Sequence, residues 1–308
     1  MTPPPRNPRV LVLLSTYNGA RYLADQIDSI LDQESVQVTL LVRDDGSQDA
    51  TPDILHAYRA NDPRVRICRG GVNLGPAHSF LDLLFHAGPG YDAIAFADQD
   101  DVWLPDKLAR AARALGREDA GSPLGYCAGL TLTDAALNPI GDTPTWRRPP
   151  AFGNALVENV AIGCTLAIND AARRILVAPG ERPDVPMHDW LVYQVVSGSG
   201  RMLYDPRPVL LYRQHARNAI GAGPNRLVRL TRAARNVRAG DAGRRTHRQN
   251  RELARLYADS LRPEARRLLE KFLTRPNGRI RLALDPAIYR QWPLDDLAMR
   301  LLVLSGKL

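Results

Sequence analysis

Three carboxylates fall within four residues directly after the apolar run Ala93–Ala97. They belong to Asp98, Asp100 and Asp101. Like charges this close raise one another's pKa unless a cation lies between them. Hard oxygen ligands of this kind suit Mg²⁺ or Mn²⁺. The alternative is an acidic turn that caps a helix beginning near Pro105, with all three side chains in water.

The segments before this acidic turn alternate between buried strands and helices. Continuous apolar runs predict strands, and apolar residues at helical spacing predict helices. Strands are expected at Arg9–Ser15, Val36–Val42, Val65–Cys68 and Ala93–Ala97, with helices at Tyr22–Leu31, Pro52–Arg59 and Pro76–His86. This alternation predicts βαβ units, an α/β fold and a mostly parallel, doubly wound sheet.

Polar clusters follow three of the expected strands, at Thr16–Gly19, Asp44–Ser47 and Asp98–Asp101. In open α/β sheets, ligands bind beyond the carboxyl ends of the strands. Capping and turn formation explain single residues, such as Asp49 as an N-cap or Gly46 as a turn glycine. They do not explain three polar clusters at the same edge, so we expect a ligand site there.

The rest of the chain alternates less regularly. The pattern predicts a helix to about Leu115, strands at Leu124–Leu132 and Ile162–Ile168, helices from Asp170 and from His188 to about Val196, and short strands at Met202–Tyr204 and Val209–Tyr212. The segment Asp142–Gly153 is rich in proline and arginine, which predicts a mobile loop over the cleft. From Asn218 onward, basic helices are expected at Leu227–Arg238, Arg251–Leu261 and Glu264–Leu273.

The net charge of +8 is unevenly distributed along the chain. Residues 1–200 carry 17 Lys and Arg against 24 Asp and Glu, whereas residues 201–308 carry 24 against 9, a net charge of +15. The basic third favours an anionic partner, so a noncatalytic protein that binds nucleic acid or an anionic surface is an alternative from another class. Nucleic acid is not expected, because this region lacks interleaved aromatic residues and a recognition motif.

Composition and cysteine usage predict a cytoplasmic protein. The chain is 44% hydrophobic and 24% charged, as in soluble globular proteins. The apolar run Val10–Leu14 is too short for a signal segment or a membrane span. Cys68, Cys127 and Cys164 lack paired spacing, so we expect three buried thiols in a reducing compartment.

Six motifs, in order, resemble those of the family 2 glycosyltransferases with the GT-A fold, a Rossmann-like mixed sheet. They are Val12–Gly19, Arg43–Ser47, Asn73–Gly75, Phe96–Trp103, His188–Trp190 and Tyr212–His215. The resemblance covers about residues 9 to 220 and is greatest to the bacterial branch that contains rhamnosyltransferases of O-antigen and cell-wall polysaccharide assembly. It implies a GT-A catalytic domain over residues 1–217 and a basic, mostly helical region over residues 218–308.

The resemblance also implies an activity. It is inverting, metal-dependent transfer of a sugar from a nucleotide donor to a glycan or lipid-linked acceptor, with Mg²⁺ or Mn²⁺ as cofactor. The favoured donor is dTDP-L-rhamnose, and UDP-galactofuranose, UDP-hexoses and GDP sugars stay open. A nucleotidyltransferase of similar topology is less expected, because the glycine-rich basic loop of such enzymes is absent after the first strand.

Site residues follow from the matched motifs. The nucleotide-binding set is Thr16, Tyr17, Asn18, Asp44, Asp45, Asn73 and Asp98. Within this set Asp45 is expected to accept the ring N3–H of uracil or thymine, with Asp44 beside it. The metal ligands are Asp98, Asp100 and His215, and the catalytic base is Asp189. Two departures are Gln99 within the acidic cluster and Leu191 where a second tryptophan is frequent.

Each of these roles has a structural alternative. Asp189 begins a predicted helix, so it also suits an N-cap. A lone histidine such as His215 is more often structural, and Trp103, Trp190 and Tyr193 are more often core residues than sugar platforms. These alternatives do not exclude the functional roles.

The C-terminal tail suggests a membrane partner. Leu294–Leu308 carries an apolar face beside Arg300 and Lys307, and arginines recur through 226–267. This combination suits peripheral binding to an anionic bilayer on the inner face of the membrane. The alternative is that the leucines pack on the catalytic domain and the arginines are solvated.

Overall fold

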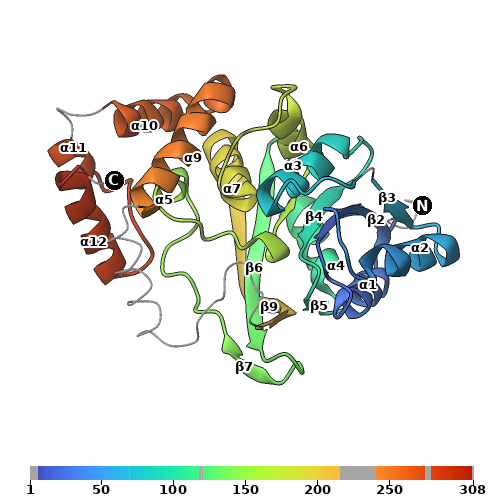
Figure 1. The fold of residues 1–308 in the computed structure, drawn as a ribbon. Helices are drawn as coiled ribbons and strands as arrows, with labels where there is room; N and C mark the ends of the chain where they lie inside the picture. Colours follow the sequence, from blue (N-terminus) through green and yellow to red (C-terminus); the bar gives the residue numbers. More distant parts are fainter. Residues whose placement is uncertain are drawn as a thin grey trace, which may run out of the picture.

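The computed structural model describes residues 6–68, 70–117, 119, 121–215, 241–274 and 279–306. Its central feature is one mixed sheet with the strand order β3-β2-β1-β4-β8-β6-β9-β5, and β7 pairs with β6 at the side (Figure 1). The α/β architecture and the mixed sheet are as the family resemblance implied, whereas the mostly parallel sheet expected from the strand–helix alternation is wrong, because β4–β8, β6–β8, β6–β7 and β5–β9 are antiparallel. The helix expected at Leu227–Arg238 lies outside the described residues.

One half of the sheet is parallel. It consists of β1 (Arg9–Thr16), β2 (Gln37–Asp44), β3 (Val65–Ile67) and β4 (Ala93–Ala97). The connecting helices are α1 (Leu23–Leu31), α2 (Thr51–Asn61) and α3 (Pro76–His86). Parallel strands need such crossovers, and their carboxyl ends all point to the same edge. The polar clusters predicted to meet therefore do lie at one edge.

The other half of the sheet mixes strand directions. Its strands are β5 (Val102–Trp103), β6 (Leu124–Thr133), β7 (Pro139–Asp142), β8 (Ala167–Ile168) and β9 (Arg201–Arg213). The short β8 is antiparallel to both β4 and β6, while β6 and β9 are parallel. The helix α4 (Lys107–Leu115) follows β5. This half brings the end of β9 beside the acidic turn after β4.

Side chains of β1 alternate between two cores. Val10, Val12 and Leu14 pack with α1, α2 and α4 on one face of the sheet. Leu11 and Leu13 face the other core, which includes α3, α5 (Phe152–Ala155), α6 (Asp170–Val177) and α7 (His188–Ser199). The period of two in a strand explains this division, because successive side chains point to opposite faces.

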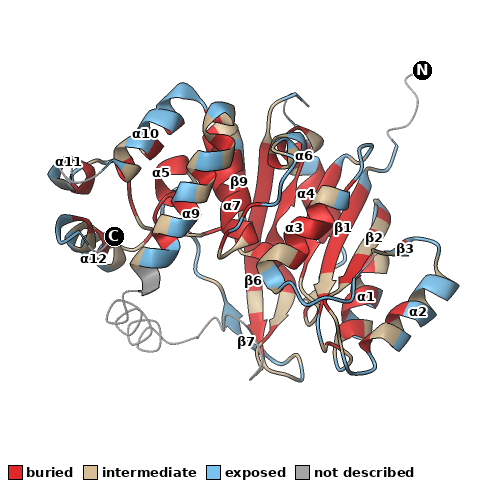
Figure 2. Cartoon of the chain, turned by 45° about the horizontal axis from the view of Figure 1, so that its top comes forward, coloured by how far each residue is buried: buried red, intermediate tan, exposed pale blue. Residues whose placement is uncertain are grey.

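The C-terminal helices form an outer layer over the second core. They are α9 (Asp241–Tyr257), α10 (Pro263–Leu273), α11 (Arg279–Ala283) and α12 (Pro293–Leu304). Leu253, Leu269 and Val303 belong to the same buried cluster as residues of α7 (Figure 2). Among the described residues, no helix is both long enough and apolar enough to cross a membrane.

Two strand predictions need correction. The strand expected at Ile162–Ile168 is a 3-10 turn, Gly163–Thr165, followed by the two residues of β8. The two short strands around residue 206 form the single strand β9, whose pairing with β6 skips Pro206 and Arg207. Arg110 stabilises this bulge, because its guanidinium donates to the carbonyls of Arg207 (3.0 Å) and Pro208 (2.8 Å). A side chain on the α4 helix thus replaces the missing sheet hydrogen bonds.

The expected loop Asp142–Gly153 and the cysteines also differ in part. Asp142 ends β7, and Gly153 lies in the buried helix α5. Between them, Arg148 stacks 3.4 Å from the Tyr289 ring centroid, so this segment is attached to the C-terminal layer. Cys127 and Cys164 are buried as predicted, whereas Cys68 is only half-buried.

Candidate active site

The loop after β1 and the acidic turn after β4 interlock through Gln99. Its Oε1 accepts from Thr16 Oγ1 at 2.6 Å and from Tyr17 N at 2.8 Å, and its Nε2 donates to Tyr17 O at 3.2 Å. A Cβ on Gly19 would lie 2.3 Å from this Oε1, so only glycine allows the approach. The glutamine that departs from an all-acidic cluster therefore positions the predicted nucleotide-binding loop.

The loop after β1 is also joined to the turn after β2. Asn18, with a φ of 48°, donates from its N to Ser47 Oγ at 2.8 Å, and its Oδ1 accepts from Gln48 N at 2.8 Å. Ser47 N donates to the Asp44 carboxylate at 3.2 Å. The predicted nucleotide-binding residues after β1 and β2 thus form one connected rim.

Asp45 lies below this rim and is 3% exposed. Its carboxylate pairs with Arg43 and accepts the amides of Leu74 and Gly75, both at 2.9 Å. These contacts occupy both carboxylate oxygens. Asp45 is therefore placed as an anchor for the loop before α3, and its expected contact with a nucleotide base stays a prediction that this geometry does not favour.

Asp44 faces open space instead. It lines a cavity of about 170 Å³ whose other walls come from α2 and from the end of β3. Gly70 approaches Asp44 closely, because a Cβ there would meet the Asp44 carbonyl oxygen at 2.2 Å. Asn73 lies farther along the same loop, is exposed, and accepts from Gly75 N at 3.0 Å. Of the two adjacent aspartates, Asp44 lines this cavity, and the described donor to its carboxylate is Ser47.

The acidic turn after β4 meets the end of β9. His215 Nε2 lies 2.8 Å from Asp100 Oδ2. Burial, and then the charges of Asp100 and Asp189, raise the pKa of Asp98 to about 7. The three expected metal ligands, Asp98, Asp100 and His215, are thus brought to one place by strands far apart in the sequence.

Arg213 supports this meeting point and was not predicted as a site residue. Its buried guanidinium donates to the Asp100 carbonyl at 3.0 Å and to Asp25 Oδ2 of α1 at 2.9 Å. It also lies 4.5 Å from the Tyr22 ring, which in turn is 5.1 Å from the His215 ring. Arg213 therefore fixes the backbone of Asp100 and the ring that contacts His215.

Asp101 is fully buried and incompletely satisfied. Among the described residues, neither of its carboxylate oxygens accepts a hydrogen bond from a nitrogen or oxygen donor, and the neighbouring polar group is the Cys164 thiol. Burial, followed by the charges of Asp98 and Asp100, raises its pKa well above the ordinary value. Ligand atoms of Asp98, Asp101 and Cys164 lie within 4.8 Å of one another.

Besides Arg213, the described side chain that brings positive charge to this turn is Lys107. Its Nζ lies 3.2 Å from the Trp103 ring centroid and donates to the Cys164 carbonyl. Burial lowers the pKa of Lys107 to about 7. Because Arg213 also pairs with Asp25, these two described cations offset the charges of Asp98, Asp100 and Asp101 only in part. Neighbouring carboxylates whose charges raise the pKa of Asp98 and of Asp101 fit a bound divalent cation.

Asp189 lies in the first turn of α7 and is buried. Gly163 N donates to its Oδ2 at 3.2 Å, and Trp190 N donates to its Oδ1 at 2.7 Å. The helix begins at His188 with Met187 in the N-cap position, so Asp189 is not the N-cap considered above. Burial raises the pKa of Asp189 to about 6. A carboxylate in this state can accept a proton near neutral pH.

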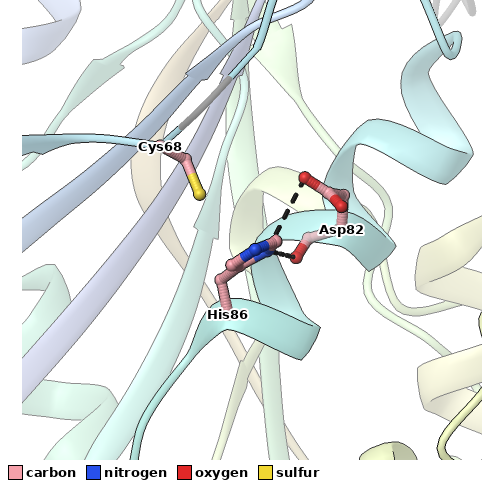
Figure 3. Close-up of side chains that lie close together, drawn as sticks. All are labelled: Cys68, Asp82 and His86. Atoms are coloured by element: carbon pink, nitrogen blue, oxygen red, sulfur yellow. Dashed lines mark hydrogen bonds and ion pairs between the residues drawn. The ribbon is translucent and has the colours of Figure 1, made fainter.

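A second group of possible metal ligands lies farther from this edge of the sheet, and neighbouring guanidinium groups compensate its negative charge. Cys68, Asp82 and His86 come close enough to suggest a metal site (Figure 3). However, the Asp82 carboxylate already pairs with Arg43 at 3.1 Å and with Arg182. His86 Nδ1 is engaged with the Asp82 carbonyl at 2.8 Å. Two guanidinium groups beside one carboxylate do not fit a divalent cation, so this group supports the fold.

Sequence reasoning found the acidic turn and missed its supports. Lys107 and Arg213 are buried cations. Arg213 lies within the motif Tyr212–His215, of which only the histidine was predicted as a site residue, and nothing in the sequence around Lys107 distinguishes it from a surface lysine. Gln99 did carry a signal, because an amide interrupts an acidic run. Asp45 shows the reverse case, since its motif position indicates a ligand contact while tertiary contacts occupy its oxygens.

Comparison with known proteins links this chain to one enzyme family. Residues 11–164, half of the chain, match the model of the glycosyl transferase family 2. A putative teichuronic acid biosynthesis glycosyltransferase TuaG from Bacillus subtilis (strain 168) is 36% identical over 60% of this chain and 71% of its own length. The dTDP-rhamnosyl transferase RfbG of Shigella flexneri is 27% identical over 68% of this chain and 74% of its own length.

Solved structures share the fold. S. aureus TarS 1–349 in complex with UDP-GlcNAc superposes with a TM-score of 0.60 at 14% identity, over 97% of this chain and 80% of that one. The mannosyltransferase PcManGT from Pyrobaculum calidifontis, in complex with GDP-Man and Mn²⁺, gives 0.53 at 18% identity, over 98% and 75%. At these identities the likeness shows the GT-A fold alone.

Proposed function

The chain belongs to glycosyl transferase family 2, and from this premise we propose that it transfers a sugar from a nucleotide donor with inversion at the anomeric carbon. The observation that carries the proposal is the meeting of Asp189 with the acidic turn. The pKa of Asp189 is raised to about 6, and its charge contributes to the raised pKa of Asp98. The turn Gly163–Thr165 joins the two, because Gly163 N donates to Asp189 and Cys164 lies beside Asp98 and Asp101.

In the proposed reaction, Asp189 removes the proton from an acceptor hydroxyl. The hydroxyl oxygen forms a bond to the anomeric carbon from one side while the bond to the nucleoside diphosphate breaks on the other side. The proton resides on Asp189, and the diphosphate leaves as an anion. At pH 7 a carboxylate of pKa about 6 is mostly ionised and is a stronger base than an ordinary aspartate.

Asp98, Asp100 and His215 would hold Mg²⁺ or Mn²⁺, with Asp101 behind them. A cation bound there would stabilise the negative charge that grows on the leaving diphosphate. Arg213 and Lys107 would keep these ligands in position when the ion is absent, because each contacts the backbone of the pocket rather than an open face.

Thr16, Tyr17, Asn18, Asn73 and Asp98 retain their proposed nucleotide-binding roles. For the base itself we assign the acceptor of the ring N3–H to Asp44. Asp44 faces the cavity beside β3, whereas the carboxylate of Asp45 is engaged by Arg43 and two amides. Asp45 then acts indirectly, by holding the loop that carries Asn73.

For the donor we favour dTDP-L-rhamnose, and for the acceptor a glycan or lipid-linked sugar of a cell-surface polysaccharide. The names of RfbG and TuaG support this choice. UDP and GDP sugars are the alternative, which the ligands of TarS and PcManGT favour. In this proposal residues 1–217 form the catalytic domain and residues 218–308 the basic region.

Hydrolysis of sugar nucleotides tests the proposal without knowledge of the acceptor. The purified protein is incubated with dTDP-rhamnose, UDP-galactofuranose, UDP-hexoses and GDP sugars in Mn²⁺ or Mg²⁺, and release of nucleoside diphosphate is measured. We expect dTDP-rhamnose to be hydrolysed fastest, with loss of the signal in the Asp189→Asn variant. A faster UDP or GDP sugar would overturn the donor alone. No release above the variant for any donor would overturn the activity.

A further inference from the structure

The last helix, α12, exposes leucines where a surface helix exposes charges. Leu294, Leu297, Leu301 and Leu304 recur at helical spacing, and their exposed fractions are 72%, 55%, 58% and 45%. Ala298 lies among them and is also exposed. An ordinary surface helix turns its apolar stripe to the core and its polar face to water. This helix has an apolar face on each side.

The charged and core-facing residues of α12 confirm that its orientation is fixed. Met299 and Val303 are buried in the core on the opposite side of the helix. Asp296 and Arg300 pair with each other at 2.8 Å, and Arg300 also donates to the Ile288 carbonyl at 3.0 Å. Turning the leucines inward would expose Met299 and Val303 and break these contacts. The leucine face is therefore a stable surface.

The neighbouring helix α11 extends the same kind of surface. Ile280 and Leu284, four residues apart, are 67% and 73% exposed. Leu284 directly follows α11, and together α11, this residue and α12 carry six of the ten exposed large hydrophobic residues in the part of the chain that the structure describes. They lie at the end of the molecule away from α2 and β3 (Figures 1 and 2). We call the six side chains the leucine face; they are Ile280, Leu284, Leu294, Leu297, Leu301 and Leu304. Exposed apolar clusters of this kind mark interaction sites.

Charge distinguishes the possible occupants of the leucine face. Residues 275–308, which include both helices of the leucine face, carry six Lys and Arg against three Asp. A second copy of the chain would bring two such basic regions together, which like-charge repulsion opposes. An anionic bilayer provides both an apolar interior for the leucines and negative headgroups for the basic residues. We propose that the leucine face docks the enzyme on an anionic lipid surface.

This proposal requires a particular orientation of α12 at the lipid surface. The leucines would enter the boundary between headgroups and acyl chains while the helix lies parallel to the surface. Arg281, which is exposed between Ile280 and Leu284, would remain at headgroup level. Binding would therefore need both the apolar side chains and the anionic lipid, and it would weaken as salt increases.

Vesicle sedimentation of the full chain tests the proposal. Vesicles contain phosphatidylcholine alone or with phosphatidylglycerol, at low and high salt. The variant Leu297→Ser/Leu301→Ser removes the centre of the leucine face, and Ile140→Ser is the matched control, because Ile140 is 46% exposed on β7. We expect wild type and control to bind phosphatidylglycerol vesicles equally at low salt, and the double variant to bind at least about tenfold more weakly. Circular dichroism and hydrolysis of the donor check that all three proteins are folded.

Other outcomes would overturn the proposal. Wild type that fails to bind anionic vesicles, or a double variant that binds as well as wild type, would exclude docking by this face. Light scattering after gel filtration tests the other possible occupant of the leucine face, a second copy of the chain. A wild-type dimer that the double variant loses would assign the leucine face to a second copy. Loss of donor hydrolysis with normal vesicle binding would contradict the proposed enzyme activity and leave the docking surface intact.

Discussion

Two groups of aspartates lie beside the same sheet, and the fold compensates their negative charges to different extents. Beside α3, the carboxylates of Asp45 and Asp82 share the guanidinium of Arg43, and Arg182 adds a second positive charge. After β4, burial and then the charges of neighbouring carboxylates raise the pKa of Asp98 and of Asp101, and burial lowers the pKa of Lys107 beside them. Among the described residues, two guanidinium groups neutralise the first group, whereas the second is offset only in part by Lys107 and Arg213.

Whether a carboxylate has a cationic partner distinguishes structural from functional residues more clearly than its burial does. Buried charges are normally paired, because an unpaired buried charge is costly. A group that the fold leaves unpaired therefore indicates a partner that comes from outside. By this reasoning the ion pairs of Arg43 hold the loop before α3 in place, and we propose that the turn Asp98–Asp101 binds a cation and a charged donor. Substitutions in the two groups should consequently act on different quantities.

The largest effect on turnover is expected from Asp189→Asn. Asparagine keeps the shape of the side chain and can accept the Gly163 amide, but it cannot accept a proton. We expect kcat to fall on the order of 100- to 10,000-fold, with donor affinity nearly unchanged. Steady-state kinetics with a fixed acceptor measure both constants. A wild-type kcat in this variant would reassign the base, and Asp101 would be the next residue to test.

Stability should respond in opposite directions in the two acidic groups. Arg43→Met leaves Asp45 and Asp82 buried without their shared partner, and breaking such a pair costs about 3–5 kcal/mol of unfolding free energy. Asp98→Asn removes a charge whose folded-state pKa is raised to about 7, so at pH 8 without metal it should raise the melting temperature. Urea and thermal unfolding measure both. If Asp98→Asn destabilised the metal-free protein, the acidic turn would be compensated after all.

The pH dependence of the rate gives a smaller effect. Because only ionised Asp189 accepts a proton, we expect kcat to rise about tenfold per pH unit below about 6 and to level off above it. The same shift has a consequence for stability. The folded state holds this proton more tightly than the unfolded chain, so the contribution of Asp189 to stability falls as pH rises from 3.8 to about 6. A kcat limb near pH 4 would contradict burial of this carboxylate in the active enzyme.

The sequence predicted the parallel half of the fold and the acidic turn well, because both are local signals. Ala93–Ala97 is a continuous apolar run, and the three aspartates that follow are neighbours in the chain. The mixed half was predicted less well. The pairing of β9 across Pro206 depends on Arg110 of α4, and the turn at Gly163 depends on Asp189. Such contacts join residues tens of positions apart, and no periodicity records them.

Contacts between residues distant in the sequence also explain why Asp44 and Asp45 have different roles in the candidate site. Asp44 and Asp45 are adjacent and chemically identical, so local sequence cannot decide which one faces a ligand. Tertiary contacts decide it, because the amides of Leu74 and Gly75 and the guanidinium of Arg43 contact Asp45 and not Asp44. The leucine face was visible as an apolar pattern, but its exposure became clear only when Met299 and Val303 were seen in the core.

The central claim is that the acidic turn Asp98–Asp101, and not the group around Asp82, takes the cation. Binding of Mn²⁺ tests this claim. Binding is measured from the electron paramagnetic resonance signal of the free ion, with and without a nucleoside diphosphate. The proteins are wild type, Asp100→Ala and, as the control from the other acidic group, His86→Ala, whose side chain is half exposed. We expect wild type and His86→Ala to bind alike, and Asp100→Ala to lose both binding and transfer while its melting temperature stays close to wild type. Normal Mn²⁺ binding by Asp100→Ala, or its loss in His86→Ala, would contradict the account.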